Sequence, residues 1–348
     1  MPLLPRLLPK LQRHPKRIVF PEGADHRILQ AARQWVTSRL GVPVLLGNRT
    51  EIKRLAQRLD VNLEGIRLLN PARSDESESF AEHLHELRAA KGMTLAEARE
   101  AVRDHSTYAA MMVMNNHVEA VIAGATQSAS NALRPLLQII PRLDGVKTVS
   151  SLMILDFDEK QIGSAGSLFM ADCGVLPNPT ADQLADIAVS TGIIAHHLTN
   201  ETPRIAMLSY TSHGTSEEPS VIKMREATRL AQARASAAKL DFAIDGELQL
   251  DAALDRYIAT AKHVESPVAG RANVLVFPDL NSGNIGFKLV QHIAGANAFG
   301  QILTGLSKPA AEISRGSSAH DVFGAAVVCG IQAIDREELF PSLENSVG

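Results

Sequence analysis

RIVFPEGADHRILQAARQWVTSRLGVPVLLG, residues 17–47, contains the pattern that decides the fold. Residues 17–20 form an apolar run of strand length, and Pro21, Glu22 and Gly23 close it. Asp25 can then cap a helix whose apolar positions repeat at intervals of three and four, namely Ile28, Leu29, Ala32, Trp35 and Val36. Residues 42–47 follow as a second apolar strand. This stretch therefore predicts one strand–helix–strand unit.

The same alternation continues through the first half of the chain. A helix capped by Thr50 and ending near Leu59 precedes a third strand at residues 66–69. A helical stretch opens at residues 74–79, breaks at Lys91-Gly92, restarts at Thr94 and ends near Met114. A fourth strand follows at residues 119–124. Strands that alternate with helices in this way predict a parallel sheet with helices on its faces.

The second half repeats the alternation with longer polar loops. Strands are expected at residues 146–157, 204–210, 241–246, 272–280 and 301–306, the last clear strand, and helices at residues 182–198 and 220–238 and after Asp321. A chain of 348 residues favours two domains. We place domain I, a discontinuous α/β domain, at residues 1–145 plus 309–348, and domain II, an inserted α/β domain, at residues 146–308. A cleft is expected where the chain crosses between them.

Composition excludes several classes of function. The net charge is −3 and there is no basic stripe, so a nucleic-acid partner is not expected. Prolines and basic residues interrupt the leucine-rich N-terminus, which argues against a signal peptide, and no apolar run could span a membrane. Two distant cysteines, Cys173 and Cys329, suit a reducing compartment. We therefore expect a cytoplasmic protein that binds small molecules.

Five polar clusters follow predicted strands, which is where open α/β sheets bind ligands. They lie at residues 124–135, 209–216, 245–253, 277–288 and 313–321. Each cluster alone is weak, because tight turns use the same glycines and hydroxyls. Five such clusters in register after five strands are a stronger indication of a ligand site.

The last cluster, ISRGSSAHD at residues 313–321, allows two interpretations. A polar turn that feeds an apolar helix can bind an anion, because the first N–H groups of a helix lack partners. Ser318 and Asp321 also have the spacing of a capping box. The two interpretations are compatible, since the cap could aim the turn.

Other motifs do not support a function. Gly283 and Gly286 lack the remainder of a dinucleotide fingerprint, and both the Walker A and the Gly-x-Ser-x-Gly patterns are absent. Asp245, Glu247 and Asp251 could bind a metal, but Glu247 and Asp251 have the spacing of a helix's acidic first turn. The histidine pairs at residues 83/85 and 196/197 lack a third ligand at a zinc-like spacing. No metal site is therefore expected.

The clusters together resemble the phosphate acetyltransferase (phosphotransacetylase) family. The matching stretches are ISRGSSAHD, SPVAGRANVLVFPDLNSGNIGFK, IDGELQLDAA, AMLSYTSHG, ALRPLLQII, RIVFPEG and PNPTADQLADIA, in the family's order, from about residue 17 to residue 333. The resemblance implies reversible acetyl transfer between acetyl phosphate and coenzyme A. It also implies two three-layer α/β domains like those of isocitrate and isopropylmalate dehydrogenases, with the active site in the cleft, and a homodimer formed through domain II. The chain looks like the short, catalytic-domain-only form.

The resemblance also assigns roles to residues. It implies three catalytic residues: Arg315 on the phosphate or carbonyl oxygen, Ser314 beside the oxyanion, and Asp321 as the base for the coenzyme A thiol. Arg88 and Arg134 match arginines that contact substrate or coenzyme A, and the loop at residues 211–215 would cradle phosphate. The full set of expected substrate-binding residues is Arg88, Arg134, Ser128, Ser209, Thr211, Ser212, Gly214, Asn281, Gly283 and Asn284. Coenzyme A enters as a substrate, and no prosthetic group or metal is expected.

The mechanism leaves a choice open at Asp321. The dipole of a helix N-terminus favours the charged carboxylate, which makes Asp321 a weak base unless the cleft excludes water. Otherwise Asp321 has a positioning role, in which it orients the thiol or holds the start of the helix while Arg315 favours the thiolate. Either route is direct thiolate attack without an acyl-enzyme, since Cys329 suits a helix core and Cys173 lacks a nearby base.

Alternatives and departures from the family pattern remain. The chain could transfer propionyl or butyryl groups, or it could be a catalytically silent acyl-CoA-binding regulator. A dehydrogenase is disfavoured, because the fingerprint and the metal carboxylates are missing. The residues that depart from the usual pattern are Gln127, His213, Ser317 and His320.

Overall fold

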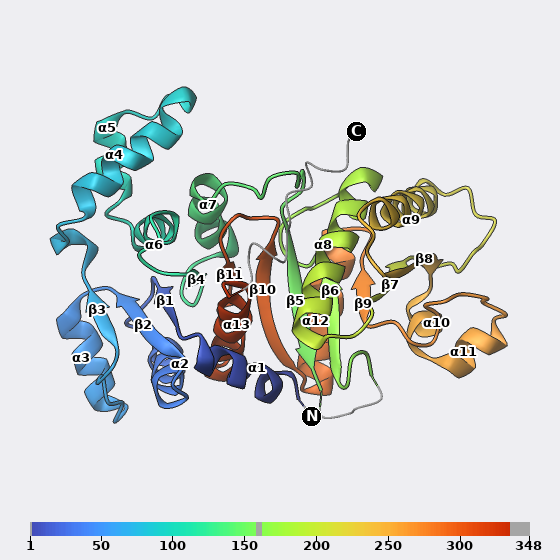
Figure 1. Cartoon of the computed structure of the whole chain (residues 1–348), viewed down its shortest axis with the longest axis horizontal. Helices are drawn as coiled ribbons and strands as arrows, with labels where there is room; N and C mark the ends of the chain where they lie inside the picture. Colours follow the sequence, from blue (N-terminus) through green and yellow to red (C-terminus); the bar gives the residue numbers. More distant parts are fainter. Residues whose placement is uncertain (1, 158–161, 335–348) are drawn as a thin grey trace. The chain divides into compact units, whose positions relative to one another are not determined.

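The computed structural model describes residues 2–157 and 162–334 (Figure 1). Its contacts divide the chain into two compact units. Unit I comprises residues 7–141 and 306–334, and unit II comprises residues 2–6, 142–157 and 162–305. Residues 335–348 of the predicted domain I lie outside the described residues. The first six residues group with unit II, although the sequence places them in domain I.

Unit I contains a parallel sheet of five strands. They are β1 (Lys16–Phe20), β2 (Gly41–Leu46), β3 (Arg67–Leu69), β4 (Ala120–Ala123) and β11 (Ala310–Glu312), in the spatial order β3-β2-β1-β4-β11. Each neighbouring pair is parallel. The parallel sheet predicted for this half of the chain is therefore confirmed.

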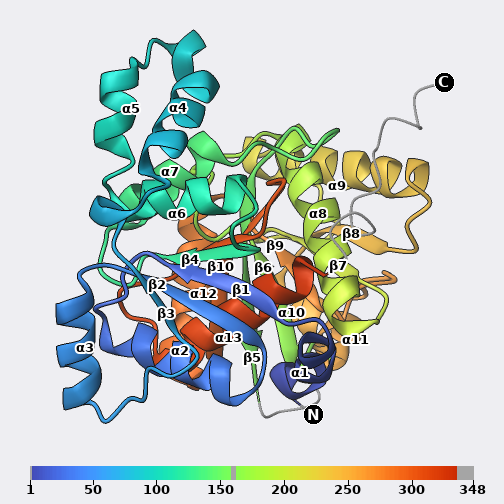
Figure 2. The same cartoon turned by 60° about the vertical axis from the view of Figure 1, so that its left-hand side comes forward.

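Helices cover both faces of this sheet, so unit I has three layers (Figure 2). Helices α2 (His26–Thr37) and α13 (Ala319–Gln332) pack against each other on one face, and α6 (His105–Met114) and α7 (Ala129–Ile139) pack together on the other. The remaining helical segments of this unit are α3 (Arg49–Arg58), α4 (Ser77–Arg88), α5 (Leu95–Ala101), η1 (Pro71–Arg73), η2 (Ala89–Lys91) and the part of α1 (Leu3–Arg13) that follows residue 6.

Local capping explains where these helices begin. Asp25 caps α2 as predicted, and its carboxylate accepts a hydrogen bond from the Arg27 amide at 2.8 Å. The cap of α3 is Asn48 and not the predicted Thr50, because the Asn48 side chain accepts from the Thr50 amide at 2.9 Å. The single helix predicted after Thr94 is two helices, since Asp104 caps α6 and interrupts the run.

Unit II contains a six-stranded mixed sheet. Its strands are β5 (Ser150–Asp156), β6 (Ser167–Ala171), β7 (Arg204–Leu208), β8 (Ala243–Leu248), β9 (Val274–Val276) and β10 (Asn297–Thr304), in the order β10-β5-β6-β9-β7-β8. Strand β5 is antiparallel to both β6 and β10, so the prediction of a parallel sheet is wrong here. The connection from β5 to β6, residues 157–166, is too short for the crossover helix that a parallel pair requires.

Two strands escaped prediction. Strand β6, SLFMA, is buried along its whole length and therefore shows no polar alternation. Strand β11, AAE, is three residues long and mostly alanine, which has low strand propensity. It follows residues 301–306, so those residues are not the last strand.

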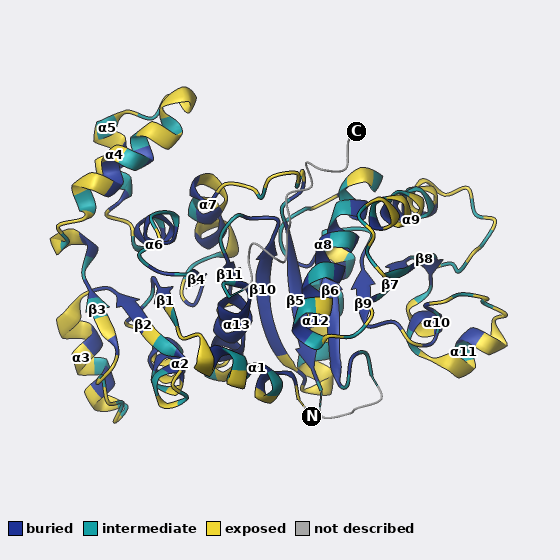
Figure 3. Cartoon of the chain, viewed as in Figure 1, coloured by how far each residue is buried: buried dark blue, intermediate teal, exposed yellow. Residues whose placement is uncertain are grey.

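Helices α8 (Ala181–Thr199) and α9 (Pro219–Ala237) pack on each other in unit II, and α8 contacts the central strands. On the sheet face that carries Met153 and Met170, α12 (Leu280–Ala294) buries Phe287 in the same core cluster. The strands between these helices are buried (Figure 3). The short helices α10 (Leu250–Leu254) and α11 (Arg256–Ala261) follow β8.

Several expectations concern buried or exposed groups. Cys329 is fully buried in α13, as predicted, and Cys173 is also fully buried. Glu247 belongs to β8, so it is not part of a helix's acidic first turn. Among the described residues, no group of three His, Cys, Asp or Glu side chains is arranged to hold a metal, and no helix is long and apolar enough to span a membrane.

Gly283 allows α12 to approach the segment after β6 closely. A Cβ atom at residue 283 would lie 2.3 Å from the carbonyl oxygen of Asp172. At Gly286, on the same helix, the nearest atom to such a Cβ is a ring carbon of Phe277 at 3.2 Å. Gly283 thus has a packing role whether or not it also contacts substrate.

We predict that Gly283→Ala lowers the free energy of unfolding by about 1–3 kcal/mol, because the backbone must move apart. Gly286→Ala is the matched control, in which a small ring shift is offset by better helix propensity, so stability changes little. Urea unfolding followed by circular dichroism measures both. Equal destabilisation by the two variants would contradict the packing role of Gly283.

Candidate functional site

Two of the predicted clusters leave the sheet of unit I side by side. Strands β4 and β11 are parallel neighbours, with Ala123 paired to Glu312. The loop that begins at Gly124 and the loop that begins at Ile313 therefore start at the same sheet edge. Gly124 has φ +110°, and a Cβ atom there would lie 2.3 Å from the Ile313 carbonyl oxygen. Only glycine permits this close passage of the two loops.

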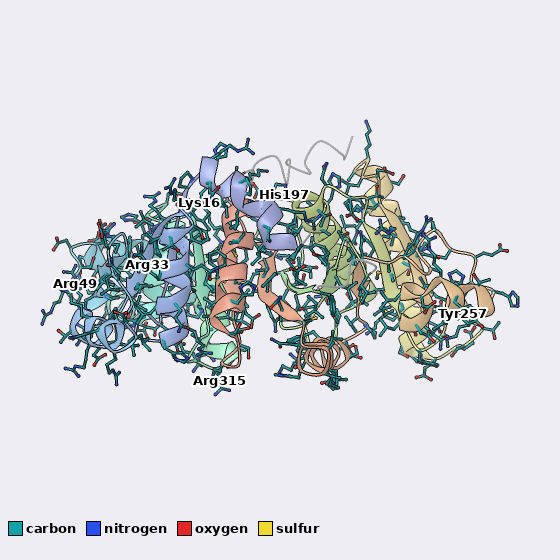
Figure 4. The ribbon with its side chains drawn as sticks, turned by 90° about the horizontal axis from the view of Figure 1, so that it is seen from below. Lys16, Arg33, Arg49, His197, Tyr257 and Arg315 are labelled. Atoms are coloured by element: carbon teal, nitrogen blue, oxygen red, sulfur yellow. The ribbon has the colours of Figure 1, made fainter. Side chains whose placement is uncertain are left out.

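The predicted capping box at the start of α13 is confirmed. The Asp321 amide donates to the Ser318 hydroxyl at 3.1 Å, and Asp321 Oδ2 accepts from the Ser318 amide at 2.8 Å and from its hydroxyl at 2.9 Å. Asp321 is only 6% exposed, whereas Ser314 and Arg315 are exposed. Figure 4 shows Arg315 at the surface. The cap therefore holds the base of a loop whose arginine faces solvent.

Arg27 joins the two loops, although sequence reasoning gave it no role. Its guanidinium donates to the carbonyl oxygens of Arg315 at 2.6 Å, Ser317 at 3.1 Å and Ala125 at 2.5 Å. Asp25 holds the same guanidinium through an ion pair of 2.9 Å. The pKa of the Asp25 carboxyl is lowered, because the bonds from Arg27 outweigh the effect of burial. The available signal in the sequence was an arginine in the first turn of a helix, two residues after its cap Asp25.

Glu22 holds the loop after β4 from the neighbouring strand. Its carboxylate accepts from the Gly124 amide at 3.1 Å and from the Thr126 amide at 3.4 Å. Burial raises the pKa of Glu22 above its ordinary value in spite of these bonds. Glu22 follows β1, and the strand order reverses between β1 and β4, which is where open α/β sheets bind ligands.

The other predicted residues of unit I lie on helices. Ser128 caps α7 by accepting from the Asn131 amide at 3.4 Å, and Arg134 is exposed on the same helix. Arg88 ends α4, and its buried Nε has no hydrogen-bond partner among the described residues. The departure Gln127 donates to the Ser106 hydroxyl at 2.9 Å. Ser128 thus lies beside the Gly124 loop, while Arg88 belongs to a separate element.

In unit II a buried carboxylate organises the loop after β7. Glu247 is 1% exposed, and it accepts from the Thr211 hydroxyl at 3.0 Å, from the Gly214 amide at 2.8 Å and from Arg225 Nε at 3.0 Å. Burial alone would raise the pKa of Glu247, but these bonds, led by Arg225, lower it. The Thr211 hydroxyl and the Gly214 amide, which were expected to bind phosphate, are therefore already hydrogen-bonded to Glu247 within the protein.

The remaining residues of this loop are also held. The Ser212 hydroxyl accepts from the Gln249 amide at 2.8 Å, and the Ser209 amide donates to the Leu248 carbonyl at 2.9 Å. His213 Nε2 lies 3.3 Å from Asp245 Oδ1. The loop is thus tied to β8 at several points.

The third predicted group lies at the start of α12. Asn281 is exposed, Gly283 is buried against Asp172, and the Asn284 amide donates to the Cys173 carbonyl at 3.0 Å. Strand β9, which leads to α12, is the parallel neighbour of β7. The groups after β7 and β9 therefore share one sheet edge. The cleft between the domains remains a prediction.

Comparisons with known proteins show which family has this sequence and fold. Residues 3–329 match the family model described as phosphate acetyl/butaryl transferase. The chain belongs to this family.

Individual relatives agree with this membership. The chain is 41% identical to the phosphate acetyltransferase of Acetivibrio thermocellus over 96% of the chain and 98% of that protein. It is 40% identical to that of Thermoanaerobacterium thermosaccharolyticum, again over 96% of the chain and 100% of that protein. The crystal structure of a phosphotransacetylase from Streptococcus pyogenes is 36% identical and has a TM-score of 0.85 over 96% of this chain and 98% of its own.

These findings confirm the family, the α/β fold and the predicted enzyme class, phosphate acetyltransferase. The family uses coenzyme A as a substrate. The roles of individual residues stay predictions.

We predict that Glu247→Gln unfolds at a lower urea concentration than the wild type at about pH 7, because Arg225 loses its charged partner. The folded pKa of Glu247 lies below its ordinary value of 4.5. Its contribution is therefore present above pH 4.5 and is lost as the pH falls through the folded pKa. Unfolding curves of the two proteins should therefore converge as the pH is lowered below 4.5. Glu265→Gln, an exposed glutamate of unit II, is the control, and a difference independent of pH would contradict the assignment.

We predict that Arg27→Lys lowers kcat/KM by about tenfold to a hundredfold, because lysine keeps the charge but cannot reach three carbonyl oxygens. Steady-state kinetics measure this change. Arg33→Lys is the control: this half-buried arginine on the same helix (Figure 4) donates to the Glu64 carbonyl oxygen at 3.0 Å, away from the two loops, so its replacement should leave kcat/KM unchanged. An Arg27→Lys enzyme with wild-type kinetics would show that catalysis does not require the hydrogen bonds from the Arg27 guanidinium to the two loops.

Proposed function

We propose that the chain converts acetyl-CoA and phosphate into coenzyme A and acetyl phosphate, reversibly, by direct attack in a ternary complex. In the direction of acetyl-CoA, the thiolate sulfur attacks the acetyl carbonyl carbon of acetyl phosphate. The carbon–sulfur bond forms, and the bond from that carbon to the phosphate oxygen breaks. Phosphate leaves with the electron pair, and the thiol proton passes to the surroundings or to a base.

The observation that carries this proposal is the pair of loops at the β4/β11 edge. Arg315 is exposed there and is fixed through its own carbonyl oxygen by Arg27. Its planar fork suits a phosphate oxygen or the developing oxyanion. The Ser314 hydroxyl accepts from the Gly316 amide at 3.1 Å, so it is oriented within the same turn and can assist at the oxyanion.

Of the two roles open for Asp321, we propose the positioning one. Its Oδ2 already accepts two hydrogen bonds from Ser318, and the residue is buried in the first turn of α13. In this role Asp321 fixes the start of the helix, and Arg315 supplies the charge that favours the thiolate. Arg88, Arg134, Ser128 and the unit II residues Asn281 and Asn284 would then contact coenzyme A or phosphate.

Assembly and location are part of the same proposal. We infer a homodimer, supported by an apolar stripe on α12 at Ile285, Leu289 and Ile293, which are four residues apart and exposed. We place the enzyme in the cytoplasm, supported by two cysteines that are both buried.

The test is phosphate-dependent release of coenzyme A from acetyl-CoA. Arg315→Ala should lower kcat about 10²–10³-fold, as loss of an oxyanion donor does. Arg58→Ala, an exposed arginine of unit I, should have no effect. Wild-type protein that binds acetyl-CoA without turnover would overturn the proposed function.

The role of Asp321 is tested by comparing two variants of the cap. If Asp321 positions the loop, Ser318→Ala and Asp321→Asn lower kcat/KM to similar extents, and the shape of the pH profile is kept. If Asp321 is the base, Asp321→Asn alone lowers kcat about 10²–10⁴-fold and removes the acidic limb of the profile. The second result would replace the positioning role.

A further inference from the structure

A second polar hollow lies in unit I, at the carboxyl ends of β2 and β3. Its volume is about 410 Å³, which falls in the range of small-molecule sites. Strand β1 separates β2 and β3 from the β4/β11 edge. The residues that line the hollow are contributed by the start of α3, the end of β3 and the turn before α4. None of them belongs to the loops of the reaction centre.

Three arginines line this hollow: Arg49, Arg67 and Arg73. Within the described part of the chain, none of their three guanidinium groups makes a hydrogen bond or an ion pair, although the backbone of Arg73 donates to Asn70 and that of Arg67 pairs with β2. Two carboxylates, Asp75 and Glu76, lie at the same hollow, so three positive charges meet two negative ones and one positive charge is left over. Guanidinium groups without partners that line one hollow are the arrangement that a phosphorylated ligand would neutralise.

The start of α3 strengthens the attraction for an anion. Arg49 is the first residue of this ten-residue helix, so the positive end of the helix dipole faces the hollow beside its guanidinium. The Asn48 side chain already accepts from the Thr50 amide at 2.9 Å. The helix therefore contributes its dipole and the Thr50 hydroxyl, while the arginines supply the direct contacts.

Ser74, Asp75 and Glu76 also line the hollow, and they can form hydrogen bonds with the hydroxyl groups of a ligand. Ser74 is fixed by the Tyr108 hydroxyl at 2.6 Å, and Asp75 and Glu76 follow it. Carboxylates accept hydrogen bonds from hydroxyl groups and repel phosphate. Arginines and carboxylates in one hollow thus suit a ligand that carries both phosphate and hydroxyl groups.

The lining is too polar for coenzyme A or another aromatic nucleotide. Leu69 is the one apolar side chain among the lining residues, which include no aromatic ring. An adenine ring or a pantetheine arm would bury apolar surface against polar groups there. A small, fully polar molecule fits better.

We propose that this hollow is a binding site for a small phosphorylated polyhydroxy compound, such as a sugar phosphate. Arg49, Arg67 and Arg73 hold its phosphate groups, and Asp75 or Glu76 accepts hydrogen bonds from its hydroxyl groups. The site is separate from the reaction centre, so it stands whether or not the proposed mechanism is correct.

Calorimetric titration of the full chain tests the site, with fructose 1,6-bisphosphate and inorganic pyrophosphate as probes. Both should bind saturably at one site per chain, and Arg67→Ala should weaken both by about tenfold or more. Arg54→Ala and Arg58→Ala, exposed arginines on α3 outside the lining, are the matched controls and should bind as the wild type does. Arg315→Ala should also retain binding.

Glu76→Gln tests the hydrogen bonds to the hydroxyl groups of the ligand. The substitution removes a negative charge, so the affinity for pyrophosphate should rise. The affinity for fructose 1,6-bisphosphate should fall relative to the affinity for pyrophosphate. No saturable binding to the wild type, or equal losses in the Arg54 and Arg58 controls, would overturn the site. Loss of binding in Arg315→Ala would move the ligand to the reaction centre, and an unchanged preference in Glu76→Gln would overturn the polyhydroxy ligand.

Discussion

The pairing of β4 with β11 is the constraint on which the proposed reaction centre of unit I depends. It joins residues 120–123 to residues 310–312, with all of unit II's sheet between them in the sequence. Because the two strands are parallel, both loops leave at one edge, and Gly124 lets them pass in contact. Arg27 then fixes the loops through their carbonyl oxygens, so that Arg315 is presented without help from a bound ligand.

Buried or half-buried carboxylates do similar work in several loops of the molecule. Glu22 accepts from the amides after β4, Glu247 from the loop after β7, and Asp172 from the amides of Gly174, Val175 and Leu176. Each gives partners to N–H groups that a loop would otherwise expose or bury unsatisfied. The loops are therefore shaped in advance, which reduces the ordering that substrate binding must impose.

The sequence was sufficient wherever the physical cause is local. The strand and helix of residues 17–37, the capping box of Ser318 and Asp321 and the burial of Cys329 all follow from spacing and polarity. The features that could not be predicted from the sequence depend on contacts with residues distant in the chain. The direction of β5 is set by its neighbours, β11 is too short to show a pattern, and Arg27 and Glu22 acquire their roles only when another strand's loop comes beside them.

The insertion of unit II also bears on how the protein is made. A ribosome delivers the chain from its N-terminus at about 5–20 residues per second, so domains that are continuous can fold as they emerge. Unit I cannot complete its folding in this way, because β11 and α13 are among its last parts to be synthesised. Helix α13 packs against α2, which lies near the N-terminus of the chain. The turn with Ser314 and Arg315 therefore emerges after the whole of unit II. A nascent chain interrupted before residue 310 would carry most of both units and lack the turn of the proposed reaction centre.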